Sequence, residues 1–507
     1  MAGAAGSSSS STQLPSVLAA MALLVLGYIN IRGTELPGLG SSFHASSDGM
    51  TRSARERRLT EQHGGHAGKA TAHIYVRSRH GSQIYVPCGL KFKPPRKSPE
   101  HMTHAEFFDY YRDVHKAEAQ RFNLTKIAGK GSYGIVAEAV DTWTGETVAI
   151  KKMIDVFLRR SDALRNLREL KLLRMMRSSE DIVGIRHVML PSTPHTYNTI
   201  FFVMESMDND LRQVVRLAKY LPPETFQVIL YQMLRGLNYM HTAQVYHRDI
   251  KPSNILINAD CKVKICDFSL ARPVYNMSRE MPSEWTGYVA TRWYRPPEMS
   301  LVKYTRWTHA MDVWGIGCVF LEAVLGRPLF PGADAEEQLS FITNLLGTPP
   351  PAVLDKYPPK VQAVLRAMPE KAPQDVAALL PAVPPDALAV ALRMLDLDPE
   401  ARPTPGQLLA DPYFADMTAR ASSRPRPGLI SEHDFAFSDM RRSLTFEELR
   451  QMLFAEMLQY HPAKVAGAAG RRGAGLSMGR SKLARGATSQ AQMKYALSAR
   501  ERAAVAM

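Results

Sequence analysis

Two short polar motifs near the middle of the chain contain the residue types that could carry out chemistry. The first, HRDIKPSN at residues 247–254, is followed after an apolar run by DFS at residues 267–269. Asn254 and Asp267 offer hard oxygen ligands of the kind that Mg²⁺ prefers. Asp249 offers a carboxylate that can accept the proton of a hydroxyl group. Together these groups suit the transfer of a phosphoryl group from a nucleotide to a hydroxyl.

A glycine-rich segment upstream offers a place for the phosphates of such a nucleotide. Glycines let backbone N–H groups approach phosphate oxygens closely, because no Cβ stands in the way. A dinucleotide-binding fold would need a helix directly after the glycines. Here residues 135–140 have a strand pattern and a Thr-Gly turn leads into a second strand, so the glycines cap a β-hairpin. The residues expected to contact the nucleotide are Ile127, Gly129, Lys130, Gly131, Ser132, Tyr133, Gly134, Ile135 and Val136.

Three further charged residues complete the expected catalytic set. Lys151, on a strand with the sequence VAIK, would reach the α- and β-phosphates. Glu169, in a helix predicted over 164–176, would hold the ammonium group of that lysine in place. Lys251 would stabilise the phosphoryl group during transfer. Each residue alone is an ordinary surface charge, but their order and spacing favour a joint role.

Length and hydrophobic pattern indicate how the chain positions these residues. The 507 residues are enough for a two-lobed catalytic domain with long flanking tails. Residues 122–207 have strand patterns and residues 208–414 are mostly helical. We therefore predict an α+β fold with a small β-rich N-lobe and a larger helical C-lobe. Helices are expected at 223–241, 312–325, 336–346 and 386–397, and the Pro/Ala/Val-rich stretch 347–385 is expected to be an irregular surface excursion.

The regions outside the two lobes carry weaker signals. We predict a disordered N-terminal extension at 1–104 with a local hairpin at 74–86. Residues 17–31 are apolar but short for a spanning helix, so a membrane tether through them is only the minor alternative. Residues 415–462 are expected to pack on the catalytic domain, followed by a basic, disordered tail at 463–507. Much of the net charge of +15 lies in that tail, and a solvated tail is favoured over contact with nucleic acid.

Several longer motifs contain most of the residues named above and extend over much of the two predicted lobes. They include GKGSYGIV, VAIKK, LRELKLL, HRDIKPSNILIN, KICDFSLAR, TGYVATRWYRPPE, DVWGIGC and TFEELRQMLFAEMLQYHP. On these motifs, the region from Glu106 to Pro462 resembles a mitogen-activated protein kinase, a CMGC serine/threonine protein kinase, most closely of the plant and green-algal type. The resemblance implies a two-lobed kinase fold that uses ATP and Mg²⁺ to phosphorylate Ser or Thr before Pro. It also implies an upstream dual-specificity MAP kinase kinase, phosphatases as partners, no specific nucleic acid, and a cytoplasmic and nuclear location.

The resemblance also implies a phosphorylation switch. Thr286 and Tyr288 lie in the expected activation loop, residues 267–298, where this family carries its dual phosphorylation site. A phosphothreonine brings nearly two negative charges and needs an arginine cluster, so phosphorylation would order a loop that is otherwise mobile. The arginines in the family's positions for this role are Arg168, Arg248 and Arg272 for the phosphothreonine, and Arg292 and Arg295 for the phosphotyrosine.

The same resemblance assigns the remaining nucleotide contacts. Met204 occupies the gatekeeper position, and Glu205 to Met207 correspond to the hinge that binds adenine. Asp210 and Ser253 would approach the ribose, and Leu256 would also contact the nucleotide.

Three other residues are expected to have structural roles. Glu298 and Arg402 are predicted to form a buried pair. Asp312, on an apolar helix, is predicted to anchor the backbone of the catalytic loop.

Some positions depart from the family's pattern. Ser269 stands where the family has glycine, Pro296 replaces an alanine, and the acidic docking patch after the catalytic domain is thin. Ser269 bears on the dynamics of the metal-binding loop, because glycine allows backbone conformations that serine resists. The alternative to an active kinase is therefore a signalling scaffold without activity. We expect an active kinase, because serine is small enough for the backbone to place Asp267.

Overall fold

The computed structural model describes residues 102–131, 134–274, 292–301, 308–419, 426–438 and 444–461, together with the backbone of two earlier strands. These strands, β1 (Ile74–Arg77) and β2 (Gln83–Val86), pair antiparallel, which confirms the predicted hairpin. The predictions for the apolar segment 17–31, the basic tail, Ser132, Tyr133, Thr286 and Tyr288 lie outside the described residues. Among the helices that are described, none is long and apolar enough to cross a membrane.

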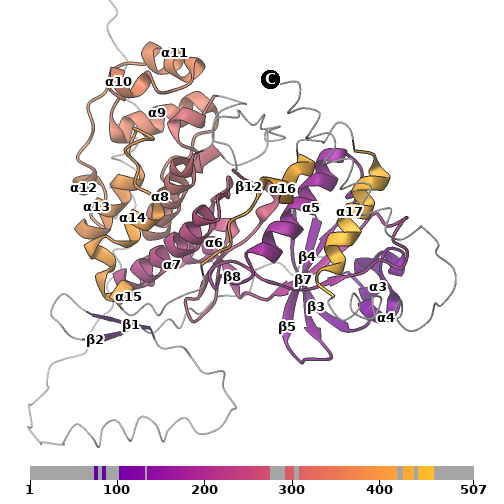
Figure 1. Ribbon diagram of the computed structural model, residues 1–507. Coiled ribbons are helices and arrows are strands. Elements are labelled where there is room, and N and C mark those ends of the chain that lie inside the picture. Colours follow the sequence, from indigo (N-terminus) through magenta and orange to yellow (C-terminus); the bar gives the residue numbers. More distant parts are fainter. Residues whose placement is uncertain are drawn as a thin grey trace, which may run out of the picture. The chain divides into compact units, whose positions relative to one another are not determined.

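The N-lobe is built on one antiparallel five-stranded sheet (Figure 1). Its strand order is β3 (Phe122–Gly131), β4 (Gly134–Asp141), β5 (Thr147–Met153), β7 (Ile200–Glu205) and β6 (Ile185–Met189). Because side chains alternate between the faces of a strand, β7 serves two cores. Phe202 and Met204 belong to the core that includes helix α5 (Arg160–Met175). Phe201 and Val203 belong to a second core on the opposite face.

An N-terminal strap, residues 102–121, supplies part of that second core. It contains α3 (His104–Phe107), the 3₁₀ helix η1 (Asp109–Tyr111) and α4 (Lys116–Ala119). Phe107 and Phe108 are fully buried and contact Phe201. Asp113 accepts hydrogen bonds from the backbone N–H groups of residues 198 and 199, at 3.2 and 2.9 Å. The strap precedes the predicted start of the N-lobe at residue 122, yet it completes one face of the N-lobe sheet.

The C-lobe is helical, as the sequence predicts. The longest of its described helices is α7 (Pro223–Thr242), which contacts α8 (His309–Leu325). Helix α8 also contacts α13 (Pro385–Met394). Trp314 and Phe320 on α8 are fully buried. The other described helices before the insert and after α13 are α6 (Leu211–Leu217), α9 (Ala335–Leu346), α14 (Pro405–Leu409) and α15 (Ala415–Ala419).

The prediction for residues 347–385 is wrong. This stretch contains three short helices, α10 (Pro351–Leu354), α11 (Pro359–Ala367) and α12 (Val376–Leu379). Proline is favoured at the first turn of a helix, where its missing N–H would be unpaired in any case, so prolines here begin helices. Leu354, Tyr357, Val361 and Leu365 pack with Leu339 of α9 in a small core of their own.

The C-terminal extension packs on the N-lobe. Helix α17 (Phe446–Leu458) lies beside α5 (Figure 1). Arg174 of α5 forms an ion pair with Glu456 at 2.5 Å, and the Tyr460 hydroxyl donates to the Leu170 carbonyl at 2.8 Å. The short helix α16 (Glu432–Phe435) brings Asp434 within 3.7 Å of Lys171. The extension therefore supports the helix that carries Glu169.

Candidate active site

Two small sheets position the polar motifs. The HRD motif follows β9 (Val245–Tyr246), which pairs with β12 (Arg272–Pro273). Asp267 follows β11 (Val263–Ile265), which pairs with β10 (Ile255–Ile257) and through it with β8 (Asn209–Asp210). Arg248 and Asp267 both have positive φ, 71° and 62°, a backbone conformation that is strained for residues other than glycine. Such strain persists only where the surroundings impose it, as they do at these two loops.

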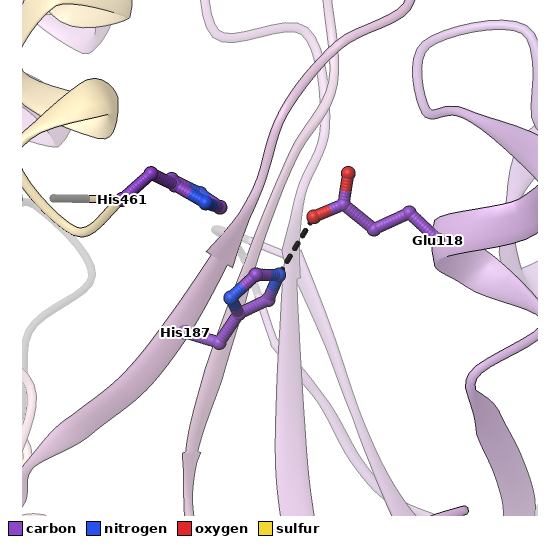
Figure 2. Close-up of side chains that lie close together, drawn as sticks. All are labelled: Glu118, His187 and His461. Carbon is purple, nitrogen blue, oxygen red and sulfur yellow. Dashed lines mark hydrogen bonds and ion pairs between the residues drawn. The ribbon is translucent and has the colours of Figure 1, made fainter. Parts of the chain in front are cut away.

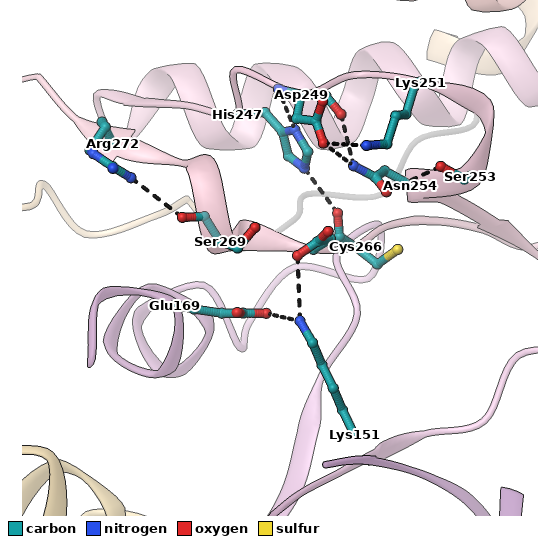
Figure 3. Close-up of polar contacts among 11 residues, drawn as sticks. Lys151, Glu169, His247, Asp249, Lys251, Ser253, Asn254, Cys266, Ser269 and Arg272 are labelled. Atoms are coloured by element: carbon teal, nitrogen blue, oxygen red, sulfur yellow. Dashed lines mark hydrogen bonds and ion pairs between the residues drawn. The ribbon is translucent and has the colours of Figure 1, made fainter. Parts of the chain in front are cut away.

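Asp249 lies at the centre of a compact hydrogen-bond network (Figure 3). The Lys251 ammonium donates to the Asp249 carboxylate at 2.6 Å. The Asn254 amide donates to the Asp249 carbonyl at 2.9 Å and to its carboxylate at 3.0 Å. These bonds fix the carboxylate and use the nitrogen of Asn254, so its amide oxygen is the atom suited to a cation.

Asp312 on α8 anchors the backbone of this loop. Its carboxylate accepts the N–H groups of His247 and Arg248 at 2.9 and 2.8 Å, and it contacts His241 Nε2 at 3.0 Å. Although burial raises the pKa of Asp312, the hydrogen bond and charge of His241 lower it below its ordinary value. The predicted role of Asp312 as the anchor of this loop is confirmed.

Lys151 on β5 pairs with one carboxylate of its own lobe, that of Glu169 (Figure 3), and with one of the C-lobe, that of Asp267. Its ammonium lies 2.6 Å from Glu169 on α5 and 3.4 Å from Asp267. Burial lowers the pKa of Lys151, but the charges of Glu169 and Asp267 outweigh it and raise that pKa above its usual range. Lys151 therefore stays protonated, and the predicted pairing of Lys151 with Glu169 is present.

Asp267 is held in its ionised form. Burial alone would raise its pKa, but the charge of Lys151 and a hydrogen bond from the Ser269 side chain lower it from 3.8 to about 2. Ser269 is buried, and a glycine at this position would lack the side chain that helps to lower the pKa of Asp267. The neighbouring Phe268 is fully buried and its ring packs edge-on against His247 at 5.5 Å. This role of Ser269 was missed from the sequence, which indicated only an effect on loop dynamics.

The five arginines are described, although Thr286 and Tyr288 are not. Burial and the nearby charge of Arg272 lower the pKa of Arg248 well below its usual range. Burial also lowers the pKa of Arg295 to about 10, with the charge of Arg292 acting in the same direction. Arg168 is buried on α5. Arg248 and Arg272, and likewise Arg292 and Arg295, are thus close enough for the charge of one to lower the pKa of the other.

The glycine-rich segment forms the turn end of the β3–β4 hairpin, as predicted. Gly131 and Gly134 are register partners across it. Gly134 has a φ of +151°, and a Cβ there would lie 1.9 Å from the Lys152 carbonyl oxygen, so no other residue fits. The dinucleotide alternative, which needs a helix after the glycines, is excluded because β4 follows them.

The predicted hinge residues lie on and after β7. Met204 is buried on that strand. The Glu205 carboxylate accepts the Gly184 N–H at 2.7 Å and pairs with Lys264 at 2.7 Å. Asp210 lies opposite Leu256 in the β8–β10 pair and caps α6 by accepting the Arg212 N–H at 2.9 Å. Ser253 contacts the Asn254 amide oxygen at 3.5 Å.

The donor set fits a hard divalent cation. The carboxylate of Asp267 is kept ionised, and the amide orientation of Asn254 leaves its oxygen as the ligand atom. Oxygen ligands of this kind suit Mg²⁺, which takes a few protein ligands and fills its other positions with phosphates and water. These two residues, on neighbouring loops, would hold it.

Comparison with known proteins decides the family. Residues 122–414 match the model of the protein kinase domain. The chain is 47% identical to mitogen-activated protein kinase 9 of Arabidopsis thaliana over 363 residues. The aligned region covers 70% of this chain and 68% of that protein. The chain belongs to the mitogen-activated protein kinases.

Further mitogen-activated protein kinases agree with this result. The chain is 45% identical over 361 residues to mitogen-activated protein kinase 15 of A. thaliana, covering 71% of this chain and 61% of the relative. It is 45% identical over 360 residues to mitogen-activated protein kinase 14 of Oryza sativa subsp. japonica, and the aligned region covers 70% of this chain and 64% of that relative. The chain thus spans less than two thirds of these two relatives.

Three predictions from the sequence are settled by these matches. The family, the two-lobed fold and the enzyme class, a protein serine/threonine kinase, are confirmed. The relatives are named as kinases, which gives no support to the alternative of an inactive scaffold. Protein kinases use ATP with a divalent metal, typically Mg²⁺.

Proposed function

We propose that this chain transfers the γ-phosphoryl group of ATP to Ser or Thr before Pro in protein substrates. The observation that carries this proposal is that two hydrogen-bond and ion-pair networks lie next to each other (Figure 3). One, around Lys151, links the N-lobe to Asp267. The other, around Asp249, links Lys251 and Asn254.

Each charged residue has a defined task in this proposal. Asp249 orients the substrate hydroxyl and accepts its proton, while Lys251 stabilises the transferring phosphoryl group. Lys151 holds the α- and β-phosphates, and Glu169 holds Lys151. Mg²⁺, bound by Asp267 and Asn254, would neutralise the charge of the phosphates. The nucleotide is enclosed by residues 127–136, Met204 to Met207, Asp210, Ser253 and Leu256.

Activation, in this proposal, follows phosphorylation of Thr286 and Tyr288 by an upstream dual-specificity MAP kinase kinase. The arrangement of Arg248 and Arg272 supports it: burial, and after it the charge of Arg272, lowers the pKa of Arg248, and a bound phosphate would offset the positive charge of both side chains. Arg168 would join them at the phosphothreonine, and Arg292 and Arg295 would bind the phosphotyrosine. Phosphatases would reverse the switch, and the kinase would act in the cytoplasm and nucleus.

A kinase assay with a neighbouring-lysine control tests the proposal. The full chain, phosphorylated on Thr286 and Tyr288, should transfer phosphate from ATP to a Ser-Pro peptide, and Lys151→Met should abolish the transfer. Lys152, next along β5, is buried and pairs with Asp109 of the strap at 2.6 Å. Lys152→Met should therefore lower stability but keep the catalytic rate of the folded protein. Equal loss of rate in both variants, or no transfer by the wild type, would contradict the proposal.

A further inference from the structure

A second cluster of chemically capable side chains contains none of the cleft residues and joins three separate segments of the chain. Glu118 comes from α4 of the strap, His187 from the sheet-edge strand β6, and His461 from the segment directly after α17 (Figure 2). One carboxylate oxygen and one nitrogen of each imidazole all lie within 4.8 Å of one another. His187 Nε2 lies 2.7 Å from Glu118 Oε1, and the two imidazole rings meet edge-to-face at 4.7 Å.

The chemistry of this set differs from that of the cleft. Two imidazoles and a carboxylate are ligands of Zn²⁺, which takes nitrogen and oxygen donors at ~2.0–2.2 Å, with a water in the fourth position of an open site. Mg²⁺ prefers oxygen donors alone. Two ligand atoms on one such tetrahedral zinc ion lie roughly 3.3–3.6 Å apart. This separation falls between the 2.7 Å of the Glu118–His187 contact and the 4.8 Å within which all three ligand atoms lie, so binding would need only small shifts of the side chains.

A backbone contact orients one of the imidazoles. His461 Nε2 lies 2.6 Å from the Val188 carbonyl oxygen. Because a carbonyl only accepts, Nε2 carries the proton there, and the lone pair of the neutral ring is on Nδ1. A histidine that donates its other ring N–H to a backbone carbonyl is the usual arrangement at a metal site, since it fixes the tautomer.

The surroundings also suit a bound ion. His461 is buried, and the side chains of His187 and Glu118 are only 17% and 15% exposed. The ring of the buried Phe122 lies 6.3 Å from that of His187. An ion pair alone explains the contact between Glu118 and His187, but it does not require the second imidazole that His461 brings to the same point.

We propose that Glu118, His187 and His461 form a binding site for Zn²⁺ or a similar divalent transition metal, separate from the catalytic cleft. The ion would join the N-terminal strap, the edge strand β6 and the C-terminal extension. Since α17 of that extension packs on α5, the site would stabilise the assembly that supports Glu169 without taking part in phosphoryl transfer.

Metal titration of the full chain tests this proposal. Metal-stripped protein without an affinity tag is titrated with Zn²⁺ by calorimetry and with Co²⁺ by its visible absorption, which is intense for four-coordinate sites. The variants are Glu118→Gln, His187→Gln and His461→Gln, because glutamine can keep the hydrogen bonds but lacks the imidazole or the charge. The matched control is His195→Gln, which removes an exposed imidazole that lies 3.1 Å from Glu447 and is no ligand of the proposed site.

The expected result is one Zn²⁺ bound by the wild type and by His195→Gln, with the Co²⁺ absorption of a four-coordinate site. Each of the three site variants should bind Zn²⁺ more than about tenfold more weakly, since even the loss of an outer-shell partner costs ~10–100-fold. Melting temperatures without metal verify that each variant folds, and Zn²⁺ should raise that temperature only in the wild type and the control. No binding by the wild type, or equal binding by the site variants, would overturn the proposal.

Discussion

Two buried charged clusters in this kinase use their hydrogen bonds in opposite ways. In the C-lobe, Arg402 donates from both terminal nitrogens to Glu298 at 2.6 and 2.9 Å, and from Nε to the Asp396 carbonyl at 2.7 Å. Its guanidinium also lies 4.8 Å from the Trp314 ring. The predicted Glu298–Arg402 pair is confirmed, and its donors are used within the protein.

The cleft cluster leaves part of its charge unmatched. One ammonium, that of Lys151, serves the two carboxylates of Glu169 and Asp267. The second oxygen of Glu169 is buried without a hydrogen-bond partner in the described part of the chain, and the Asp267 side chain is 27% exposed. In the structural pair, therefore, the charged groups satisfy one another within the protein. In the catalytic cluster, bound metal and nucleotide would supply the interactions that the protein does not.

The largest effect is expected at the centre of the cleft network. Asp249→Asn removes the carboxylate that accepts the substrate proton but keeps the shape of the side chain. We expect kcat to fall by about 10²–10⁴-fold, the usual contribution of general acid–base catalysis. The melting temperature should change little. A variant that kept its rate would show that Asp249 is not the base.

The next largest effect is expected at the buried Glu298–Arg402 ion pair. Arg402→Met leaves the Glu298 carboxylate buried without its partner, which typically costs about 3–5 kcal/mol of unfolding free energy. Urea denaturation measures it. The double variant with Glu298→Gln should recover part of the loss, because the uncompensated charge is gone. Equal instability of single and double variants would mean that packing of Arg402 on Trp314, not charge, is what matters.

A smaller effect is expected from the pH dependence of Asp267. Its pKa is lowered from 3.8 to about 2 in the folded protein, so its contribution to stability is present above 3.8 and is lost as the pH falls through about 2. A shift of this size corresponds to at most about 2.5 kcal/mol. Asp267→Asn should therefore flatten the dependence of unfolding free energy on pH in this acidic range. An unchanged pH profile would contradict the lowered pKa.

The smallest effect is expected at Ser269. Ser269→Ala removes the hydrogen bond to Asp267, worth about 0.5–1.5 kcal/mol, and should lower kcat severalfold. Ser269→Gly removes the same bond and also frees the backbone. If the hydroxyl matters, the two variants should lose activity alike. If loop dynamics matter more, only Ser269→Gly should change the rate, which would contradict the assigned role of the hydroxyl.

Much of the fold could be predicted because local patterns determine it. The 223–241 helix, the glycine-capped hairpin and the loop anchored by Asp312 all follow from periodicity or from contiguous motifs. The insert at 347–385 was misjudged because its prolines, interpreted as breakers, occupy the first turns of helices. The strap was missed because its two buried phenylalanines lie in a short segment without a periodic pattern.

The charged residues of the active site could also be predicted, because they lie in contiguous sequence motifs. Lys151, Glu169, Asp249, Asn254 and Asp267 lie in motifs whose spacing indicates their chemistry. The contribution of the Ser269 side chain to the lowered pKa of Asp267 depends on how the folded loop places the two residues, which the residue types do not reveal. The cluster of Glu118, His187 and His461 depends on tertiary packing, because its members lie in three distant segments.

The account depends most directly on whether the unmatched charges of the cleft act in phosphoryl transfer. The decisive measurement is the initial rate of phosphate transfer from Mg-ATP to a Ser-Pro peptide by the doubly phosphorylated full chain, for the wild type and for Asp267→Asn. We predict transfer by the wild type and, at an equal folded fraction, almost none by the variant. Equal rates for the two proteins, or a wild type that binds Mg-ATP without transferring phosphate, would contradict the account.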